Sequence, residues 1–137
     1  MTLVVDASVA VKWFIIEPGR PEARRLLDRE QRLIAPELLV AEVVNVLWQR
    51  LISGAIARSQ AAEAARELPQ LLSELCPLVS LATRALAIAD ELRHPAYDCF
   101  YLALAEVRDA RLVTADRRFA ARLDGTPWQA RATTLWS

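Results

Sequence analysis

Two carboxylates stand directly after buried, β-branched runs of the chain. Asp6 follows residues 3–5, and Asp116 follows residues 112–114 with one residue between. In an open parallel sheet, ligands bind beyond the carboxyl ends of the strands, where the strand order reverses. If the two runs are neighbouring strands, both carboxylates lie at the same edge of the sheet. Each could equally be the N-cap of the helix that follows it.

Two further acids lie inside apolar helical segments. Glu42 belongs to the apolar run 38–47, and Asn45, three residues on, projects from the same helix face. Asp98 stands near the start of the run 97–107, where a helix dipole stabilises an ionised carboxylate by about 0.3–1 kcal/mol. We expect these polar side chains to be partly enclosed, because their neighbours are core-type residues. The alternatives are a solvated surface stripe for Glu42 with Asn45 and a helix N-cap for Asp98.

Four carboxylates in one pocket would require a cation. Two like charges 4 Å apart repel by about 4 kcal/mol at an effective dielectric constant of 20, so at least one of the four pKa values should be raised. Lys12 is the only lysine and His94 the only histidine of the chain. We therefore expect Mg²⁺ or Mn²⁺, since hard cations prefer carboxylate oxygens and retain waters that a substrate phosphate can replace. With a single histidine, Cys76 and Cys99 are too few for a zinc site, and we expect two reduced thiols.

Short β-type runs alternate with longer helical patterns along the chain. Strands are expected at residues 3–5, 32–35, 78–81 and 112–114, with an edge strand at 133–135. Helices are expected at residues 20–30, 36–52, 59–74, 82–92, 97–107 and 116–123, with a kink or break at Pro69. Strands separated by helices imply right-handed crossovers and a parallel sheet covered on both faces. The sequence predicts an α/β sandwich.

Composition limits the class of protein. The 137 residues are 54% hydrophobic, which fits a single domain spanning 1–137. No apolar run approaches the roughly 20 residues that cross a bilayer, and the N-terminus lacks a signal-peptide pattern, so we expect a soluble, cytoplasmic protein. Seventeen basic residues balance seventeen acidic ones, so any contact with nucleic acid must rest on a local patch or a bound metal. The segment 108–131 holds six arginines, which suit phosphate or are simply a solvated surface.

Four short segments, taken together, resemble PIN domains and, within them, the VapC toxins of toxin–antitoxin pairs. They are residues 5–8 (VDAS), 42–45 (EVVN), 97–105 (YDCFYLALA) and 113–119 (VTADRRF). The resemblance covers nearly the whole chain. It implies a three-layer α/β/α fold with a central parallel sheet and a magnesium- or manganese-dependent endoribonuclease. By the same match, the metal-binding acids would be Asp6, Glu42, Asp98 and Asp116, and the accessory positions that orient acids or water would be Ser8, Asn45 and Thr114.

The resemblance also implies partners, namely an RNA substrate, a second copy in a homodimer, and a cognate antitoxin whose tail enters the active-site groove. Trp13, Leu47 and Trp48 are candidates for a partner surface, because the helices 20–30 and 36–52 are rich in apolar residues. Core burial of the same three side chains is the alternative.

The mechanism expected of such a site is metal-assisted hydrolysis. Metal held mainly by Asp6 and Asp98, with Glu42 and Asp116 binding directly or through water, would activate a water for in-line attack on phosphorus. A dehalogenase-like phosphatase needs a second acid where Ser8 stands, and a receiver module needs a late strand-end lysine. A catalytically inert PIN-fold interaction module would normally have lost acids. A DNA-directed nuclease of the same fold stays open.

Overall fold

A single parallel sheet runs through the centre of the protein. The computed structural model describes residues 1–28 and 30–136. Its strands are β1 Thr2–Val5, β2 Arg32–Pro36, β3 Glu74–Cys76, β4 Arg111–Thr114 and β5 Ala132–Thr134. They lie in the order β3-β2-β1-β4-β5, and every pairing is parallel.

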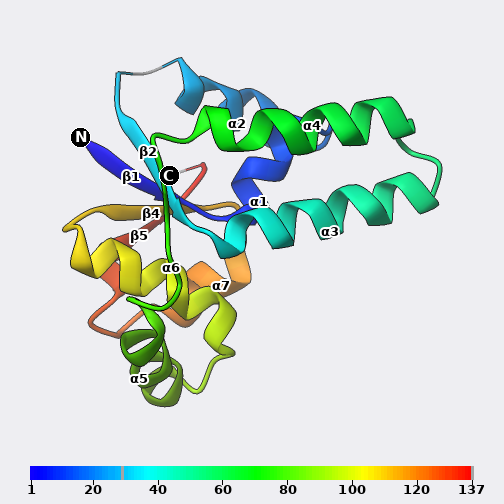
Figure 1. Cartoon of the computed structure of the whole chain (residues 1–137). Helices are drawn as coiled ribbons and strands as arrows, with labels where there is room; N and C mark the ends of the chain where they lie inside the picture. Colours follow the sequence, from blue (N-terminus) through cyan, green and yellow to red (C-terminus); the bar gives the residue numbers. More distant parts are fainter. Residues whose placement is uncertain (29, 137) are drawn as a thin grey trace.

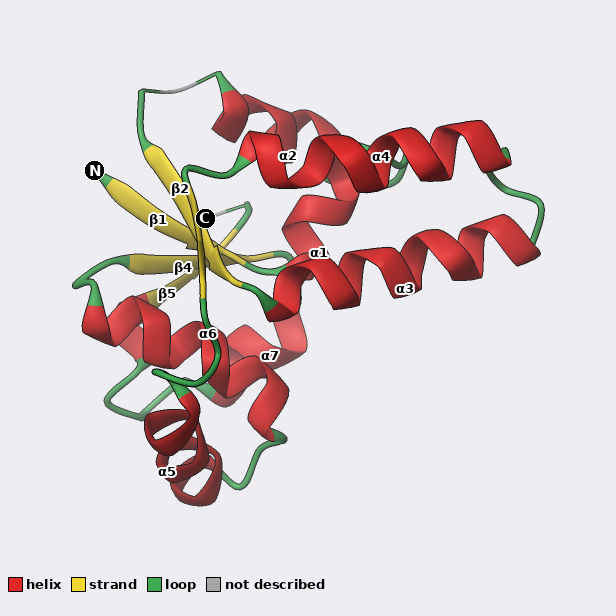
Figure 2. Ribbon diagram, viewed as in Figure 1, coloured by secondary structure: helices red, strands yellow, loops and turns green. Residues whose placement is uncertain are grey.

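Helices cover both sides of this sheet (Figure 1). They are α1 Ala7–Ala10, α2 Arg20–Leu27, α3 Leu38–Ile52, α4 Arg58–Leu71, α5 Ala82–Leu92, α6 Ala96–Val107 and α7 Arg117–Arg122, with 3₁₀ turns at Val11–Trp13 and Gln129–Arg131. In Figure 2, α5 and α6 lie below the sheet and α2 and α4 above it, while α3 and α4 form a hairpin that reaches beyond the sheet. The expected three-layer α/β/α sandwich is confirmed.

The strand order reverses between β1 and β4. Val4 of the central strand pairs with Ile34 on one side and with Leu112 on the other. The chain first builds outward from β1 through β2 to β3, and then crosses to the opposite side of β1 to form β4 and β5. The carboxyl ends of β1 and β4 therefore flank the point where α/β sheets bind ligands, which confirms the expected neighbourhood of Asp6 and the end of β4.

Helix α6 is the most deeply buried helix element around this edge. It contacts β1, β2 and β4, and residues 101–105 are all buried. An apolar surface all round a helix is typical of a central position, as its sequence predicts. Its first turn carries Asp98, whose negative charge acts on Asp6 at the end of β1.

The third strand differs from the sequence prediction. Residues 78–81 form a turn, and the strand is Glu74–Cys76, whose Leu75 pairs with Ala35 of β2. This edge strand carries a charged residue, Glu74, because ion pairs with Arg32 and Arg108 hold it. The apolar residues 78–81 led to a wrong strand prediction, because the position of this strand is set by its pairing with β2 and not by hydrophobicity.

Two helix ends also differ from the sequence prediction, and one short helix was not predicted. Helix α4 ends at Leu71 and not at residue 74, two residues after Pro69, whose ring nitrogen cannot donate to the helix ladder. Helix α2 ends at Leu27, and residue 29 of the predicted segment lies outside the described residues. The short helix α1 was not predicted. It begins because Asp6 caps it.

Of the three predicted partner-surface residues, only one is exposed. Trp13 and Leu47 are 2% and 3% exposed and belong to the core, so this part of the hypothesis is wrong, whereas Trp48 on α3 is 54% exposed. The Trp13 indole donates to the carbonyl of Ala23, 3.0 Å away, which satisfies its one polar group in the interior. Among the described helices, none combines the length and apolar character that crossing a bilayer demands.

We predict that Trp13→Ala lowers the free energy of unfolding by about 3–5 kcal/mol, because it opens a large cavity in the core. Trp48→Ala is the matched control and should change it by less than about 0.5 kcal/mol, as for most surface substitutions. Urea denaturation of the three proteins measures both effects. Equal losses in the two variants would contradict the placement of Trp13.

Candidate active site

Asp6 lies at the end of β1, on the switch point of the sheet. Its side chain is buried, and Oδ1 accepts hydrogen bonds from the Ser8 hydroxyl at 2.5 Å and from the Val9 amide at 3.3 Å. Burial raises the pKa of Asp6 to about 6, and the negative charge of Asp98 adds to the rise, whereas the hydrogen bonds oppose it. Asp6 is therefore both the N-cap of α1 and a site carboxylate.

The end of β4 is tied to Asp6 through two hydroxyl groups. Thr114 is fully buried, and its Oγ1 lies 3.3 Å from Oγ of Ser8. Ser8 also accepts from the Ala115 amide at 2.9 Å, and Thr114 accepts from the Asp116 amide at 3.1 Å. These bonds fix the ends of the two central strands relative to each other, and with them the carboxylate of Asp6. The expected positioning role of Ser8 and Thr114 thus has a defined geometry.

Glu42 reaches the same place from α3. It is half-buried, and its Oε1 accepts from the hydroxyl of Tyr101 at 2.5 Å. Burial raises the pKa of Glu42, and Asp98 adds to this. The pKa of Tyr101 is raised well above its ordinary value by burial and by Glu42, with further contributions from Asp6 and Asp98. Tyr101 thus remains a hydrogen-bond donor and stands among three carboxylates.

Two side-chain contacts of the site were not anticipated from the sequence, that of His94 with Asp98 and that of Tyr101 with Glu42. A signal for Tyr101 exists, because it carries a polar group in the buried part of α6, three residues after Asp98 on the same helix face. A buried tyrosine hydroxyl requires a partner, and here that partner is Glu42 of α3.

Asp98 stands in the first turn of α6, where its charge interacts favourably with the helix dipole. The N-cap of this helix is Pro95, so the alternative of Asp98 as a cap is wrong. Its Oδ2 lies 2.6 Å from Nε2 of His94, whose ring packs on Phe119 with centroids 5.1 Å apart. His94 thereby fixes one oxygen of Asp98, and the negative charge of Asp98 raises the pKa values of Asp6 and Glu42.

Asp116 is held differently from the other three acids. It is exposed, and its Oδ1 accepts from the Phe119 amide at 3.0 Å, so it is the N-cap of α7. The cap interpretation is therefore correct for Asp116. Its backbone amide donates to the hydroxyl of Thr114, which in turn contacts the hydroxyl of Ser8, and this chain of contacts connects Asp116 to the other acids. Asp116 also lines a cavity of about 380 Å³ next to His94.

A cavity of about 420 Å³ opens beside Glu42. Its lining includes Ser8 from α1 and Asn45 from α3, which confirms that Glu42 and Asn45 share a helix face. Asn45 itself is exposed, so the expectation that both would be enclosed holds only for Glu42. Lys12 and Glu17 complete its polar lining.

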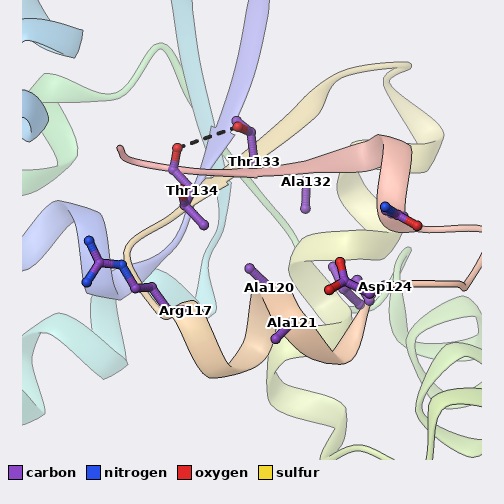
Figure 3. A pocket seen from close by; sticks show the side chains of 9 residues that line it. Arg117, Ala120, Ala121, Asp124, Ala132, Thr133 and Thr134 are labelled. Atoms are coloured by element: carbon purple, nitrogen blue, oxygen red, sulfur yellow. Dashed lines mark hydrogen bonds between the residues drawn. The ribbon is translucent and has the colours of Figure 1, made fainter. Parts of the chain in front are cut away.

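Another cavity, of about 350 Å³, lies between α7 and β5 and is unrelated to the acids (Figure 3). Its labelled lining residues are Arg117, Ala120, Ala121, Asp124, Ala132, Thr133 and Thr134. Arg117 and Asp124 lie at opposite ends of it in this view. The alanines between them offer no chemistry, so the cavity beside Glu42 is the better candidate.

The acid cluster fits a hard divalent cation by the chemistry of its donors. Asp6, Glu42 and Asp116 form no ion pair with any described lysine, arginine or histidine. As the described side chains stand, no three His, Cys, Asp or Glu groups surround one point at ligand distance. The donors are nevertheless all carboxylate oxygens, which Mg²⁺ and Mn²⁺ prefer. The predicted rise in pKa is confirmed, with burial as its larger cause and repulsion as the smaller.

Cysteine chemistry plays no part in this cluster. Cys76 and Cys99 are both free and buried, which confirms the expected absence of a disulfide between them. Burial raises the pKa of each thiol to about 11. A thiol with such a pKa is protonated at neutral pH and is a poor nucleophile.

An α/β/α sandwich whose parallel sheet carries a group of carboxylates at its switch point is typical of domains with an acidic active site. A family model of the PIN domain matches residues 3–123, and the chain belongs to this family. It is 32% identical to Ribonuclease VapC3 of Pyrobaculum aerophilum over 89% of this chain and 95% of that one. It is 35% identical to Ribonuclease VapC1 of Mycobacterium tuberculosis over 86% of this chain and 88% of that one.

Solved structures agree on the fold. PAE2754 from Pyrobaculum aerophilum superposes with a TM-score of 0.68 at 25% identity, covering 92% of this chain and 82% of the other. A toxin–antitoxin complex from Klebsiella pneumoniae gives a TM-score of 0.64 at 17% identity, covering 97% of both chains. At that identity the second likeness is one of fold alone.

We predict that Asp6→Asn stabilises the metal-free protein at pH 7. The folded-state pKa of Asp6, about 6, lies above the value of 3.8 for an exposed aspartate, so the folded state binds the proton more tightly than the unfolded state. Stability therefore falls as pH rises from about 4 to about 6, and the variant, which lacks this titration, should gain up to about 3 kcal/mol above pH 6. Below pH 4 the two proteins should be equally stable.

Urea denaturation in chelator between pH 4 and pH 8 measures this difference. Asp90→Asn is the control, because Asp90 is an exposed residue of α5 whose carboxylate pairs with the exposed Arg93 at 3.5 Å. Its stability profile should match that of the unmodified protein. If the free energy of unfolding of Asp6→Asn varies with pH in the same way as that of the other two proteins, Asp6 is not a buried carboxylate with a raised pKa.

Proposed function

We propose that this protein is a magnesium- or manganese-dependent endoribonuclease, the toxin of a toxin–antitoxin pair. The observation that carries the proposal is the group of three carboxylates in which Asp98 interacts with both Asp6 and Glu42, and in which burial raises the pKa values of Asp6 and Glu42. The identity to two VapC ribonucleases along most of the chain supports RNA as the substrate. Both thiols are free, in agreement with action in the reducing cytoplasm.

The residues that would hold the metal are these three acids, with Asp116 contributing the oxygen that does not cap α7. A bound Mg²⁺ or Mn²⁺ would supply the Lewis acidity that activates a water and stabilises charge on the phosphoryl oxygens. Ser8 and Thr114 hold Asp6 in position, and His94 holds Asp98.

Tyr101 and Asn45 would act on either side of Glu42. Tyr101 donates to Oε1 and leaves Oε2 available, so it orients the carboxylate without neutralising it. Asn45 lines the cavity beside Glu42 and can accept from or donate to a water or a substrate hydroxyl there. These contacts are those of a preorganised site, in which polar groups are fixed before the substrate arrives.

We predict that cleavage of RNA requires Mg²⁺ or Mn²⁺ and stops in chelator. Asp6→Asn and Asp98→Asn should each lower the cleavage rate by at least about 100-fold, as expected when a group that stabilises the transition state is removed. Asp90→Asn should cleave like the unmodified protein. Gel analysis of a structured RNA and of a single-stranded DNA of the same sequence provides the measurement.

Three outcomes bear on this proposal. Chelator-resistant cleavage would exclude the metal, and full activity in both site variants would exclude the acids. Cleavage of the DNA in preference to the RNA would instead identify a DNA-directed nuclease of the same fold.

We further propose that a cognate antitoxin covers an exposed apolar stripe on α3. Val44, Trp48 and Ile52 are 43%, 54% and 66% exposed, and their spacing of four residues places them on one helix face. An exposed apolar face of this kind marks a protein interface, and a toxin–antitoxin complex shares this fold.

We propose a homodimer as the state of the free chain.

We predict that Trp48→Glu abolishes co-purification with the product of the neighbouring antitoxin reading frame and leaves the mass of the free protein unchanged. Val79→Glu is the control, because Val79 is 90% exposed in the turn before α5. Light scattering of the free variants completes the test. If Trp48→Glu halves the mass instead, the stripe is the surface between two copies, and unchanged complex formation would exclude it from both.

A further inference from the structure

Among the described residues, one cationic side chain lines the cavity beside the acids. Lys12 lines it together with Ser8 and Glu42, and its side chain is only 11% exposed. Its ammonium lies 2.9 Å from Oε1 of Glu17. A lysine is rarely buried at this level unless its charge is paired, and Glu17 is the partner here.

The charge of Lys12 is only partly compensated. The second oxygen of Glu17, Oε2, accepts from Arg50 at 2.9 Å, so two cations share a single carboxylate. The three groups together carry a net charge of +1. Lys12 has three N–H donors and donates one to Glu17, which leaves two for a further acceptor in the cavity.

The position of the ammonium is fixed from both ends. The backbone of Gly19 has a φ of +93°, and a Cβ there would lie 3.1 Å from Cδ and Cε of Lys12 and 2.8 Å from the ring of Trp136. The stem of Lys12 therefore packs against the bare Cα of Gly19, while Glu17, two residues earlier, holds its tip. A side chain fixed in this way loses little conformational entropy on binding a ligand.

We propose that Lys12 binds a backbone phosphate of the RNA in this cavity, with Glu17 and Arg50 as positioning residues. The inference rests on the proposed ribonuclease function and specifies how its substrate is held. An RNA strand must bring phosphate groups close to three carboxylates, which repel it. A lysine ammonium is a compact point charge that binds phosphate oxygens, and Lys12 is the cation that lines the same cavity as Glu42.

The test measures RNA affinity separately from cleavage. Fluorescence anisotropy of a labelled 12-nucleotide RNA is recorded in chelator at 50 to 200 mM KCl. Lys12→Met should raise Kd about tenfold, the effect of one lost charge-assisted hydrogen bond. It should also reduce the slope of log Kd against log salt by about 0.7, the contribution of one phosphate contact on a single strand. Lys12→Arg should restore most of both, and Arg66→Met, an exposed cation on α4, should change neither.

Glu17→Gln distinguishes phosphate binding from a structural role. If the Lys12–Glu17 pair only supports the fold, Lys12→Met and Glu17→Gln break the same pair and should weaken RNA binding and thermal stability equally. If Lys12 binds phosphate, Glu17→Gln leaves both cations in place, so it should keep the full salt slope and bind RNA at least as tightly as the unmodified protein. Thermal melts of all variants accompany the titrations.

The outcomes separate the two proposals. Equal effects of Lys12→Met and Glu17→Gln, a wild-type salt slope in Lys12→Met, or no RNA binding by the unmodified protein would each overturn the phosphate site. Binding that depends on Lys12, in a protein that cleaves no RNA with Mg²⁺ or Mn²⁺, would support the phosphate site and reject the ribonuclease.

Discussion

The burial of one carboxylate, Asp6, is the constraint to which the surrounding structure is adapted. The central position of β1 places it at the switch point, where it is 6% exposed and no described cation pairs with it. A negative charge in that position is unfavourable, because burial removes it from water, and this raises the pKa of Asp6 to about 6. The hydroxyl of Ser8 and the amide of Val9 reduce this cost without neutralising the charge. The fold thereby keeps a buried negative charge where a bound cation would be stabilised.

Two other acids are held in a similar way, one by a hydroxyl group and one by an imidazole. Glu42 accepts from the hydroxyl of Tyr101, and Asp98 contacts the imidazole of His94. An arginine in either place would satisfy the carboxylate and remove its affinity for metal, because the attraction between the two opposite charges would have to be given up. The choice of hydroxyl and imidazole partners therefore fixes geometry while preserving negative charge, which is the combination that a metal-assisted hydrolase requires.

The sequence predicted those parts of the site that follow from local pattern. The strand-end rule placed Asp6 and the end of β4 together, and an apolar helix marked Glu42 as enclosed, because both arguments use residues adjacent in sequence. Tyr101 escaped prediction because its partner lies 59 residues away on α3. The strand Glu74–Cys76 escaped because pairing with β2 sets its position, and the predicted capping role of Asp116 proved compatible with its place beside the site.

The arginine-rich segment 108–131 shows why the charge relevant to RNA is local. Most of these arginines are engaged within the fold: Arg108 pairs with Glu74, Arg131 with Asp109, Arg122 donates to two carbonyls, and Arg117 stacks on Trp136. Guanidinium groups used in this way hold the C-terminal part of the chain in place, and part of their charge is compensated within the fold. A protein of zero net charge that binds a polyanion must then concentrate its attraction at few points. The net positive group around Lys12, set against the acid cluster, is such a point, and it would bind a single phosphate where the chemistry takes place.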